Sequence, residues 1–271
     1  KAPGVASVVI ASTADPTVQT TVDATVTPAF AMPGQRYKLA LAVSAEPHST
    51  GVPADTVLRM SFDRPPTLGK AGSVRIFRKA DGALVDIIRT GEEIGAIGYP
   101  GQARSRYLRH TPIKVSGNVL TIKPHGGKLA WDTEYYVAVE NGVVDGATLG
   151  GLPFAGIGKN AGWSFRTKAA APGGASITVD DDGPADFRTV QGALNHAMSR
   201  FGKAAPVTIN VRNGSYEELL FILAKDNLTI RGESRDGVVI HATNSDGVNP
   251  GSGLSQAAGS PSFSGGRSLL M

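Results

Sequence analysis

Residues 176–242 read SITVDDDGPADFRTVQGALNHAMSRFGKAAPVTINVRNGSYEELLFILAKDNLTIRGESRDGVVIHA. Within them, residues 177–179 form a short apolar strand, and Thr189 is a favoured N-cap residue for a helix. Apolar residues follow Thr189 at i, i+3, i+4, i+7, i+8 and i+11, the spacing of one helix face. This face consists of Val190, Ala193, Leu194, Ala197, Met198 and Phe201.

Short apolar strands follow the predicted helix at close intervals. We expect them at residues 207–211, 219–222, 228–230 and 238–240. Because they start about 9–12 residues apart, there is no room for helices between them. Parallel strands can still pair if the chain turns corners through successive sheets, and an amphipathic helix can cover the open end. Residues 176–271 therefore predict the first coils of a right-handed parallel β-helix behind a capping helix, with a loop at 244–267 and the next strand at 268–271.

The rest of the chain divides at residues 169–175, which read AAAPGGA and offer no side chain able to build a core. We interpret this segment as a linker. Residues 51–168 contain short strands separated by turn signals, which is typical of a β-sandwich. Residues 1–50 are predicted to be an N-terminal extension or linker, or a small accessory β element.

The strands expected in residues 51–168 are 57–62, 75–77, 84–88, 119–122, 135–139 and 163–167. Asp81-Gly82 is the predicted hairpin turn between two of them, because glycine accepts a positive φ. A further half-buried strand is predicted upstream, where apolar residues recur at every second position: Tyr37, Leu39, Leu41 and Val43.

Three runs in the sandwich region carry a resemblance to known domains. They are SFD at 61–63, DTEYYVAV at 132–139 and WSFRT at 163–167. In this order they resemble the bacterial immunoglobulin-like domains of surface and secreted proteins. The resemblance implies an antiparallel β-sandwich.

Composition limits the classes of site and partner. The absence of cysteine excludes disulfides, thiolate metal sites and a cysteine nucleophile. No window approaches the roughly 20 apolar residues that span a bilayer, so no membrane span is expected. A net charge of +4 favours an acidic partner; nucleic acid and a polyuronate such as pectin both satisfy this, and charge alone does not choose between them. Because no nucleic-acid-binding motif is present, no nucleic-acid partner is predicted. The basic cluster is interpreted as a solvated loop: Arg104, Arg106, Arg109 and His110.

Three motifs mark the C-terminal stretch: Ala185–Gln191, Gly214–Glu218 and Gly232–Gly237. In order and spacing they resemble the pectin methylesterases, whose corresponding patterns are Gly-Asp-Phe-x-Thr-Val-Gln, Gly-x-Tyr-x-Glu and Gly-Glu-Ser-Arg-Asx-Gly. Ala185 replaces the usual glycine. Gly192 stands where a capping-box glutamate is common, which costs the helix on the order of 1 kcal/mol.

The resemblance implies hydrolysis of galacturonate methyl esters in pectin, with release of methanol. In this family one aspartate is the nucleophile and a second is general acid and then base, and no metal or organic cofactor is needed. The motifs that carry these residues, Gln-Asp-Thr-Leu, Asp-Phe-Ile-Phe-Gly and Leu-Gly-Arg-Pro-Trp, are absent from the sequence, as is a Gly-x-Ser-x-Gly elbow. No catalytic residue is therefore assigned. We expect the chain alone to be inactive and the catalytic residues to lie beyond Met271.

Thr243 is the one residue predicted to contact substrate. By the resemblance it matches a position that touches the galacturonate chain, and the alternative is a hydroxyl that bonds its own strand end. Structural roles are predicted for three others: a packed ring and bonded hydroxyl for Tyr216, pairing with backbone donors for Glu218, and an ion pair across a turn for Glu233 and Arg235.

Two further features have no assigned ligand. The acidic run 180–182 has the composition of a cation site, but a lone acidic turn is usually solvated. His196 lies on the polar side of the predicted helix, and none of the five histidines has a partner that the sequence identifies. No metal and no cofactor are therefore predicted.

Three functions remain open from the sequence. The first is a monomeric bacterial pectinesterase, secreted, periplasmic or at the cell surface. Secretion agrees with Lys1 in place of Met, as expected after removal of a signal peptide or tag. The second is a non-catalytic carbohydrate-binding or surface module. The third is a pectate lyase of the same architecture, which would need Ca²⁺ and carboxylate ligands that the sequence does not identify.

Overall fold

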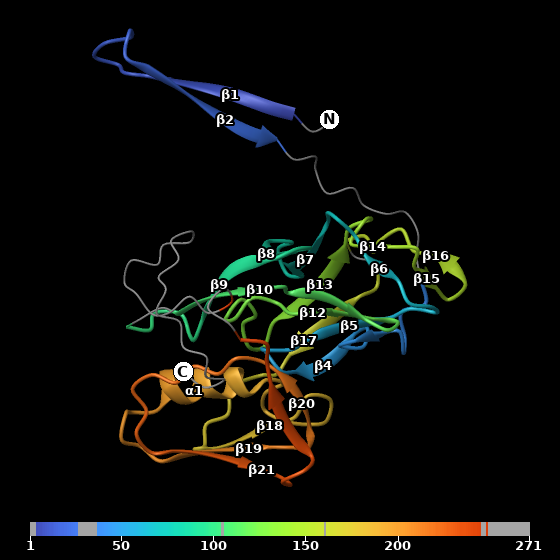
Figure 1. Cartoon of the computed structure of the whole chain (residues 1–271), viewed down its shortest axis with the longest axis vertical. Helices are drawn as coiled ribbons and strands as arrows, with labels where there is room; N and C mark the ends of the chain where they lie inside the picture. Colours follow the sequence, from blue (N-terminus) through green and yellow to red (C-terminus); the bar gives the residue numbers. More distant parts are fainter. Residues whose placement is uncertain (1–3, 27–36, 104–105, 160, 245–247, 249–271) are drawn as a thin grey trace.

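The computed structural model describes residues 4–26, 37–103, 106–159, 161–244 and 248. In these ranges the chain is mainly β, as predicted, with a single α-helix (Figure 1). That helix has 11 residues, and no helix in the described ranges has the length and apolar character to cross a membrane. Apart from Asn244 and Val248, the predicted loop at 244–267 and strand at 268–271 lie outside the described residues.

An antiparallel hairpin lies near the start of the chain. Strands β1 (Gly4–Ala11) and β2 (Gln19–Val26) pair along all eight residues of each. Both are rich in Val, Ile and Thr, whose branched side chains favour extended backbone. The hairpin is a small β element, one of the structures expected for residues 1–50, and stands at the top of Figure 1.

Two sheets form the body of residues 37–168. The four-stranded sheet has the order β11-β12-β5-β3 and consists of β3 (Val43–Ser44), β5 (Leu58–Ser61), β11 (Ile113–Ser116) and β12 (Val119–Ile122). The five-stranded sheet has the order β4-β17-β13-β7-β8 and consists of β4 (Ser49–Val52), β7 (Ser73–Arg78), β8 (Leu84–Arg89), β13 (Glu134–Val139) and β17 (Ser164–Thr167). We call this part the two-sheet unit.

Three short antiparallel pairs complete the two-sheet unit. They are β6 (Thr67–Leu68) with β14 (Val144–Asp145), β9 (Glu93–Ile97) with β10 (Arg106–His110), and β15 (Thr148–Leu149) with β16 (Leu152–Pro153).

One apolar core is shared by the two sheets. Leu58 and Met60 of β5 reach it from one sheet, and Ile76 of β7 from the other, all without exposed surface. Such alternate residues of a strand point to the same face, which is why the sequence shows period-two patterns here. Trp163 is fully buried in this core, and its indole Nε1 donates to the carbonyl of Ala45 at 2.9 Å.

The six strands predicted for residues 51–168 are confirmed, with ends shifted by one or two residues. The hairpin between β7 and β8 turns at Asp81-Gly82, where Gly82 has a φ of 69°. One pairing differs from an all-antiparallel unit, since β17 pairs with β4 in parallel.

The strand predicted at residues 37–43 is wrong. The chain forms a tight turn there, in which the N–H groups of Ala42 and Val43 both donate to the carbonyl of Leu39. Leu39 and Val43 are buried, but Leu41 points to solvent with 90% of its surface exposed and has a φ of 64°. The alternation of apolar residues therefore reflects two buried anchors on either side of a turn.

We predict that Leu41→Gly raises the free energy of unfolding by about 0.5–1 kcal/mol, because glycine adopts a positive φ without strain. Leu84→Gly is the matched control, since this half-exposed leucine lies in β8, and we expect it to lower stability by about 1 kcal/mol. Urea unfolding followed by circular dichroism measures both. Equal destabilisation by the two variants would contradict the turn.

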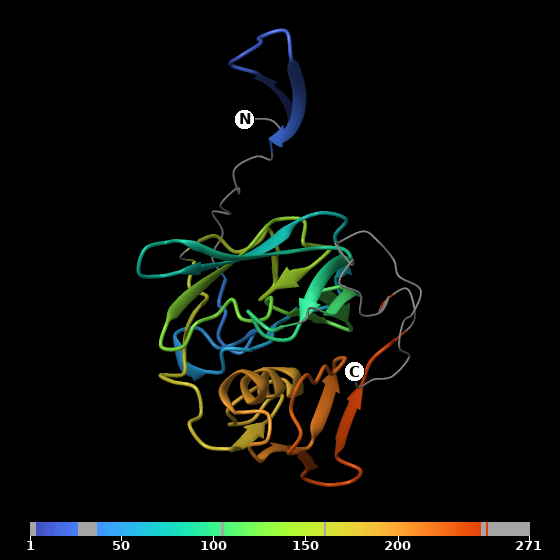
Figure 2. The ribbon, with the colours of Figure 1, turned by 90° about the vertical axis from the view of Figure 1, so that its left-hand side faces the viewer.

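Residues 176–241 form a second body, which we call the parallel-strand unit. It contains β18 (Ser176–Val179), α1 (Val190–Arg200), β19 (Val207–Val211), β20 (Gly214–Glu217), β21 (Leu228–Gly232) and β22 (Val238–His241). Strands β18, β19 and β21 make one parallel sheet in that order, and β20 and β22 make a second. Figure 2 shows α1 and these strands on one side of the two-sheet unit.

Helix α1 is confirmed with its predicted cap and apolar face. Thr189 has extended backbone and its side chain accepts from the N–H of Gly192. Val190, Ala193 and Leu194 have no exposed surface and pack with the apolar residues of β18 and β19 in a second core. The helix ends at Phe201, whose extended backbone stops the helical hydrogen bonding.

The strand predicted at residues 219–222 is wrong. Leu219, Leu220 and Phe221 are buried in succession instead of alternately. The backbone N–H of Phe221 donates to the Gln191 side chain at 2.8 Å, so this segment lies against α1 and forms no strand beyond a single β-bridge at Leu220. The strand that pairs here is β20, just before it.

Candidate functional site

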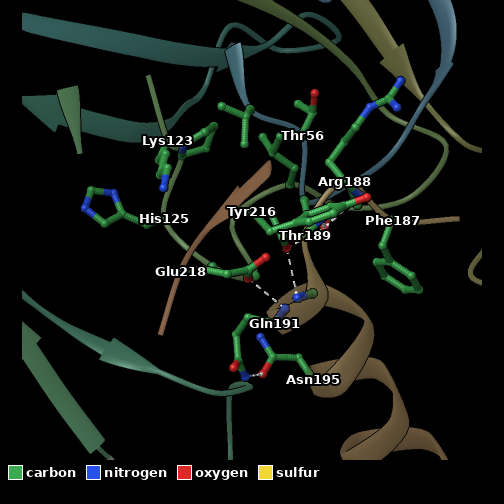
Figure 3. A pocket seen from close by; sticks show the side chains of 18 of the residues that line it. Thr56, Lys123, His125, Phe187, Arg188, Thr189, Gln191, Asn195, Tyr216 and Glu218 are labelled. Carbon is green, nitrogen blue, oxygen red and sulfur yellow. Dashed lines mark hydrogen bonds between the residues drawn. The ribbon is translucent and has the colours of Figure 1, made fainter. Parts of the chain in front are cut away.

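The N-terminus of α1 is held by carboxylates from both units. Glu218 accepts from the N–H groups of Val190 and Gln191, each at 2.8 Å, which confirms its predicted pairing with backbone donors (Figure 3). Asp55, which precedes β5 in the two-sheet unit, accepts from the N–H groups of Arg188 at 3.0 Å and Thr189 at 2.8 Å and from the Thr189 hydroxyl at 2.7 Å. The first N–H groups of the helix are therefore all paired.

Both residues are partly buried. Burial raises the pKa of Asp55 and of Glu218, while the hydrogen bonds from the start of α1 act in the opposite direction. The positive end of the helix dipole also favours their ionised forms. Gly192 makes room for the arrangement, because a Cβ at this position would overlap the carboxylate of Asp55. Glycine is thus required here for a reason other than backbone conformation.

We predict that Asp55→Ala lowers the free energy of unfolding by about 2–4 kcal/mol, because it leaves buried donors unpaired. Gly192→Ala should also destabilise the wild-type chain, although this change normally stabilises a helix by about 1 kcal/mol. In the Asp55→Ala background the overlap with the carboxylate is gone and only the Thr189 hydroxyl, 2.8 Å from the added Cβ, still lies close, so Gly192→Ala should cost much less stability than in the wild-type chain. A double-mutant cycle by urea unfolding tests this, and additive effects would contradict the contact.

Further contacts join the two units around α1. Lys114 forms an ion pair with Glu217 at 2.5 Å, and the Lys123 ammonium donates to the carbonyl of Glu217 at 2.7 Å. On another side, Lys168 lies 3.9 Å from Asp186. The pair contacts are partly exposed and individually weak, so the buried hydrogen bonds to α1 contribute more to the docking of the units.

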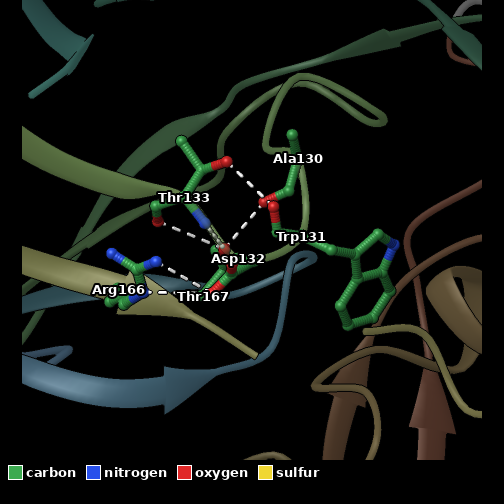
Figure 4. Close-up of polar contacts among 6 residues, drawn as sticks. All are labelled: Ala130, Trp131, Asp132, Thr133, Arg166 and Thr167. Atoms are coloured by element: carbon green, nitrogen blue, oxygen red, sulfur yellow. Dashed lines mark hydrogen bonds and ion pairs between the residues drawn. The ribbon is translucent and has the colours of Figure 1, made fainter. Parts of the chain in front are cut away.

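Trp131 extends from the two-sheet unit to the second core (Figure 4). Its ring meets Phe187 edge to face, with centroids 6.0 Å apart. The loop that presents it is fixed on both sides: the Thr133 hydroxyl donates to the Trp131 carbonyl at 2.8 Å, and the Thr167 hydroxyl donates to the Ala130 carbonyl at 2.7 Å. The indole is therefore held in a defined position.

A groove of about 910 Å³ lies between the two units. Aromatic rings of Tyr99 and Trp131 line it, together with polar side chains from α1 and from β20 and β22. Its cations are Arg59, Lys123, Arg188 and, with a pKa raised to about 9, His125, and its acids are Asp55, Asp181, Glu217 and Glu218. Because the two signs are nearly matched, the groove does not share the basic excess of the whole chain. Burial lowers the pKa of Lys123.

One pair in the groove has the residue types of a nucleophile and its base. The Ser215 hydroxyl lies 3.0 Å from His241 Nε2, and both residues are exposed on neighbouring parallel strands. Catalysis by such a pair needs a third group that orients the imidazole and donors for the oxyanion. In the described ranges no hydrogen bond orients the other ring nitrogen of His241. The pair is therefore a contact without the remaining parts of a catalytic triad.

No protein-family model, curated protein or solved structure matches this chain. The roles of its residues are therefore inferred from their own chemistry and placement.

The predicted substrate contact, Thr243, is exposed and lies just beyond the end of β22. It is not among the described residues that line the groove, whereas His241, two positions earlier, is. The assignment of Thr243 to substrate binding remains a prediction. No sequence pattern marks Lys123 or Trp131 as groove residues, because their convergence depends on how the two units dock.

Two structural predictions in the parallel-strand unit can be compared with the contacts. Tyr216 is buried as expected, and its hydroxyl donates to the Arg212 carbonyl at 2.9 Å; burial raises its pKa to about 12. The ion pair predicted between Glu233 and Arg235 is wrong. Glu233 pairs with Arg212 at 3.0 Å and accepts from the Asn213 N–H, because the turn brings these residues, and not its own neighbour, to the carboxylate.

The basic cluster is also different from the prediction. Arg106 and His110 belong to β10 rather than to a solvated loop, and Arg106 is only 7% exposed. Arg109 forms an ion pair with Glu92 at 3.3 Å. Arg104 lies outside the described residues. Strand pairing with β9 explains the difference, since alternate residues of a strand face inward whatever their charge.

His196 and the acidic run both have local partners. His196 Nε2 lies 3.0 Å from the Pro172 carbonyl, and its ring contacts Phe187 and Phe201. In the run 180–182 the three carboxylates lie close enough to share an ion, but Asp180 already accepts from the N–H groups of Asp182 and Gly183. Asp180 is thus an acceptor within its own turn, and these hydrogen bonds point to no ligand.

A second group of titratable residues, which we call the histidine cluster, consists of Asp86, Glu93, His110 and His125. His125 Nδ1 lies 2.6 Å from Asp86 Oδ1, and its Nε2 lies 2.5 Å from Glu93 Oε1. His110 Nε2 lies 3.3 Å from the same Glu93 oxygen. The hydrogen bond with Asp86 raises the pKa of His125 to about 9, whereas burial lowers the pKa of His110.

We predict that, in the presence of a chelator, NMR titration gives His125 a pKa of about 9 and that Asp86→Asn moves it toward 6.5. A folded-state pKa above the unfolded value means that protonated His125 stabilises the fold fully below pH 6.5 and loses this contribution as the pH rises through 9. His196 is the internal control, since burial lowers its pKa. A His125 that titrates below His196 would contradict the hydrogen bonds.

Proposed function

We propose that this chain is part of a pectin methylesterase that hydrolyses the methyl esters of polygalacturonate and releases methanol. In this proposal residues 176–241 are the first coils of a right-handed parallel β-helix, α1 covers its end, and the two-sheet unit is an immunoglobulin-like domain. The protein acts outside the cytoplasm, secreted, periplasmic or at the surface of a bacterium, where its polymeric substrate is found.

The observation that supports this proposal best is the way successive strands alternate between two parallel sheets. Strand β19 pairs with β21 in one sheet, and β20, which follows β19, pairs with β22 in the other. Val207 lies opposite Leu228, and Gly214 lies opposite Val238, so each turn of the chain takes roughly 20–25 residues, a size typical of solenoid repeats. Coiling of this kind is what the pectin methylesterase motifs imply.

The three motifs also occupy positions that suit such a coil. Ala185–Gln191 leads into α1, Gly214–Glu218 contains β20, and Gly232–Gly237 makes the turn between β21 and β22. Two of their side chains stabilise the fold: Glu218 accepts from the N–H of Val190, and the Tyr216 hydroxyl donates to the Arg212 carbonyl. The two catalytic aspartates of this mechanism are not assigned to any residue of the sequence, so the chain alone is expected to bind without hydrolysing.

An alternative is a non-catalytic carbohydrate-binding module. It is supported by Tyr99 and Trp131, because aromatic rings that line a groove can stack on sugar rings. The balanced charge of the groove favours a highly methylesterified, nearly neutral stretch of polymer over a fully ionised one.

The proposal predicts methanol release from methylesterified pectin by the protein as isolated from the cells that make it, and none by the 271-residue chain. No release by the isolated protein would overturn the esterase. For the chain, binding to immobilised pectin should fall at least about tenfold in Trp131→Ala and remain unchanged in Tyr107→Ala, an aromatic residue that does not line the groove. Binding that depends on Trp131, with no methanol from either protein, would favour the alternative.

A further inference from the structure

The histidine cluster assembles from three separate segments of the two-sheet unit. Glu93 and His110 lie directly opposite each other on β9 and β10, so their side chains emerge on the same face. His125 follows β12, and its backbone N–H donates to Asp86 Oδ2 at 2.9 Å, which ties this loop to β8. Three potential ligand atoms are thus brought together by strand register and by one anchored loop.

The separations of these atoms suit a small metal ion. One ring nitrogen each of His110 and His125 and a carboxylate oxygen of Glu93 all lie within 4.8 Å of one another. With metal–ligand distances of about 2.0–2.2 Å, two ligands of a tetrahedral zinc ion stand about 3.3 Å apart. The 3.3 Å between His110 and Glu93 already has this value, and the 2.5 Å between His125 and Glu93 needs only a side-chain adjustment.

Asp86 provides the outer partner that metal-binding histidines usually have. Its side chain is 3% exposed, and it bonds His125 Nδ1 at 2.6 Å, which fixes the ring so that Nε2 faces Glu93 and His110. A carboxylate behind a histidine in this way sets the tautomer and raises the basicity of the ligand nitrogen. This buried carboxylate distinguishes the cluster from a chance grouping on the surface.

Gly95 allows His110 to take its position. A Cβ on Gly95 would lie 2.5 Å from His110 Cε1, so the imidazole ring covers the backbone of β9 at this point. With this support on one side and Glu93 on the other, the ring of His110 is directed toward His125, at a centroid distance of 6.5 Å.

We propose that Glu93, His110 and His125 bind a divalent transition metal ion, with Asp86 as the positioning residue. Two imidazoles and one carboxylate are a donor set that suits zinc, and three protein ligands leave a coordination position for water. The ligand side chains are between 24% and 38% exposed, so an ion can reach them. His125 also lines both the groove and a second hollow of about 450 Å³, which places the metal at the margin of the candidate site.

The test is isothermal titration calorimetry of the chelator-treated chain with Zn²⁺. We expect one ion per chain with micromolar or tighter affinity, and His110→Gln or Glu93→Gln should weaken binding at least about tenfold. Asp86→Asn should weaken it by about 10–100-fold and change the visible absorption of the Co²⁺-substituted protein, a readout that a purely structural role would leave unaltered.

His241→Gln is the matched control, because His241 is an exposed histidine outside the cluster. The affinity of this variant for Zn²⁺ should equal that of the wild type. Circular dichroism confirms that each variant is folded. Absence of binding by the folded wild-type chain overturns the proposal. So does binding that His110→Gln and Glu93→Gln leave unchanged, which would mean adventitious surface binding. The outcome is independent of whether the protein hydrolyses pectin.

Discussion

The docking of the two cores depends on the first turn of helix α1. A helix leaves its first N–H groups without partners, and leaving them buried and unpaired costs free energy. Here Asp55 accepts from the N–H group of the cap residue Thr189 and from that of Arg188 before it, and Glu218 accepts from the next two. Since Asp55 comes from the two-sheet unit and Glu218 from the parallel-strand unit, neither part satisfies the helix by itself. This shared requirement determines how the units meet.

The groove is built on the same contacts. Its lining includes Asp55, Glu218 and Gly192, and Trp131 reaches across to the second core from the opposite side. A ligand in the groove would therefore lie against the residues that hold the units together. Binding and docking are energetically linked in such an arrangement, because any ligand that prefers the docked state stabilises it.

Local pattern was sufficient to predict α1 and most strands, because helical and strand periodicities are properties of neighbouring residues. It failed where tertiary contacts decide the backbone. Residues 37–43 alternate like a strand but form a turn, and Leu219 begins a buried run that hydrogen-bonds to α1 side chains. The three motifs in residues 185–237 carry no information about Asp55, which lies in the other unit.

The candidate sites could not be predicted from the sequence either, because their residues meet only through tertiary contacts. Asp55 meets Arg188 across more than a hundred residues, and His110 meets Glu93 only because β9 and β10 pair in one register. A shift of that register by one residue would turn the histidine to the other face. By contrast, the pairing of Glu218 with backbone donors was predicted, because a partly buried carboxylate needs donors, but its partners at Val190 and Gln191 follow from the fold.

The shared cap on α1 also has a consequence for the order in which the protein is made. Synthesis proceeds from the N-terminus, and domains generally begin to fold as they emerge. The two-sheet unit, complete by Thr167, would already present Asp55 when α1 leaves the ribosome. The folded two-sheet unit would then act as a template on which the helix forms, and the strands of the parallel-strand unit would pack against it as they emerge.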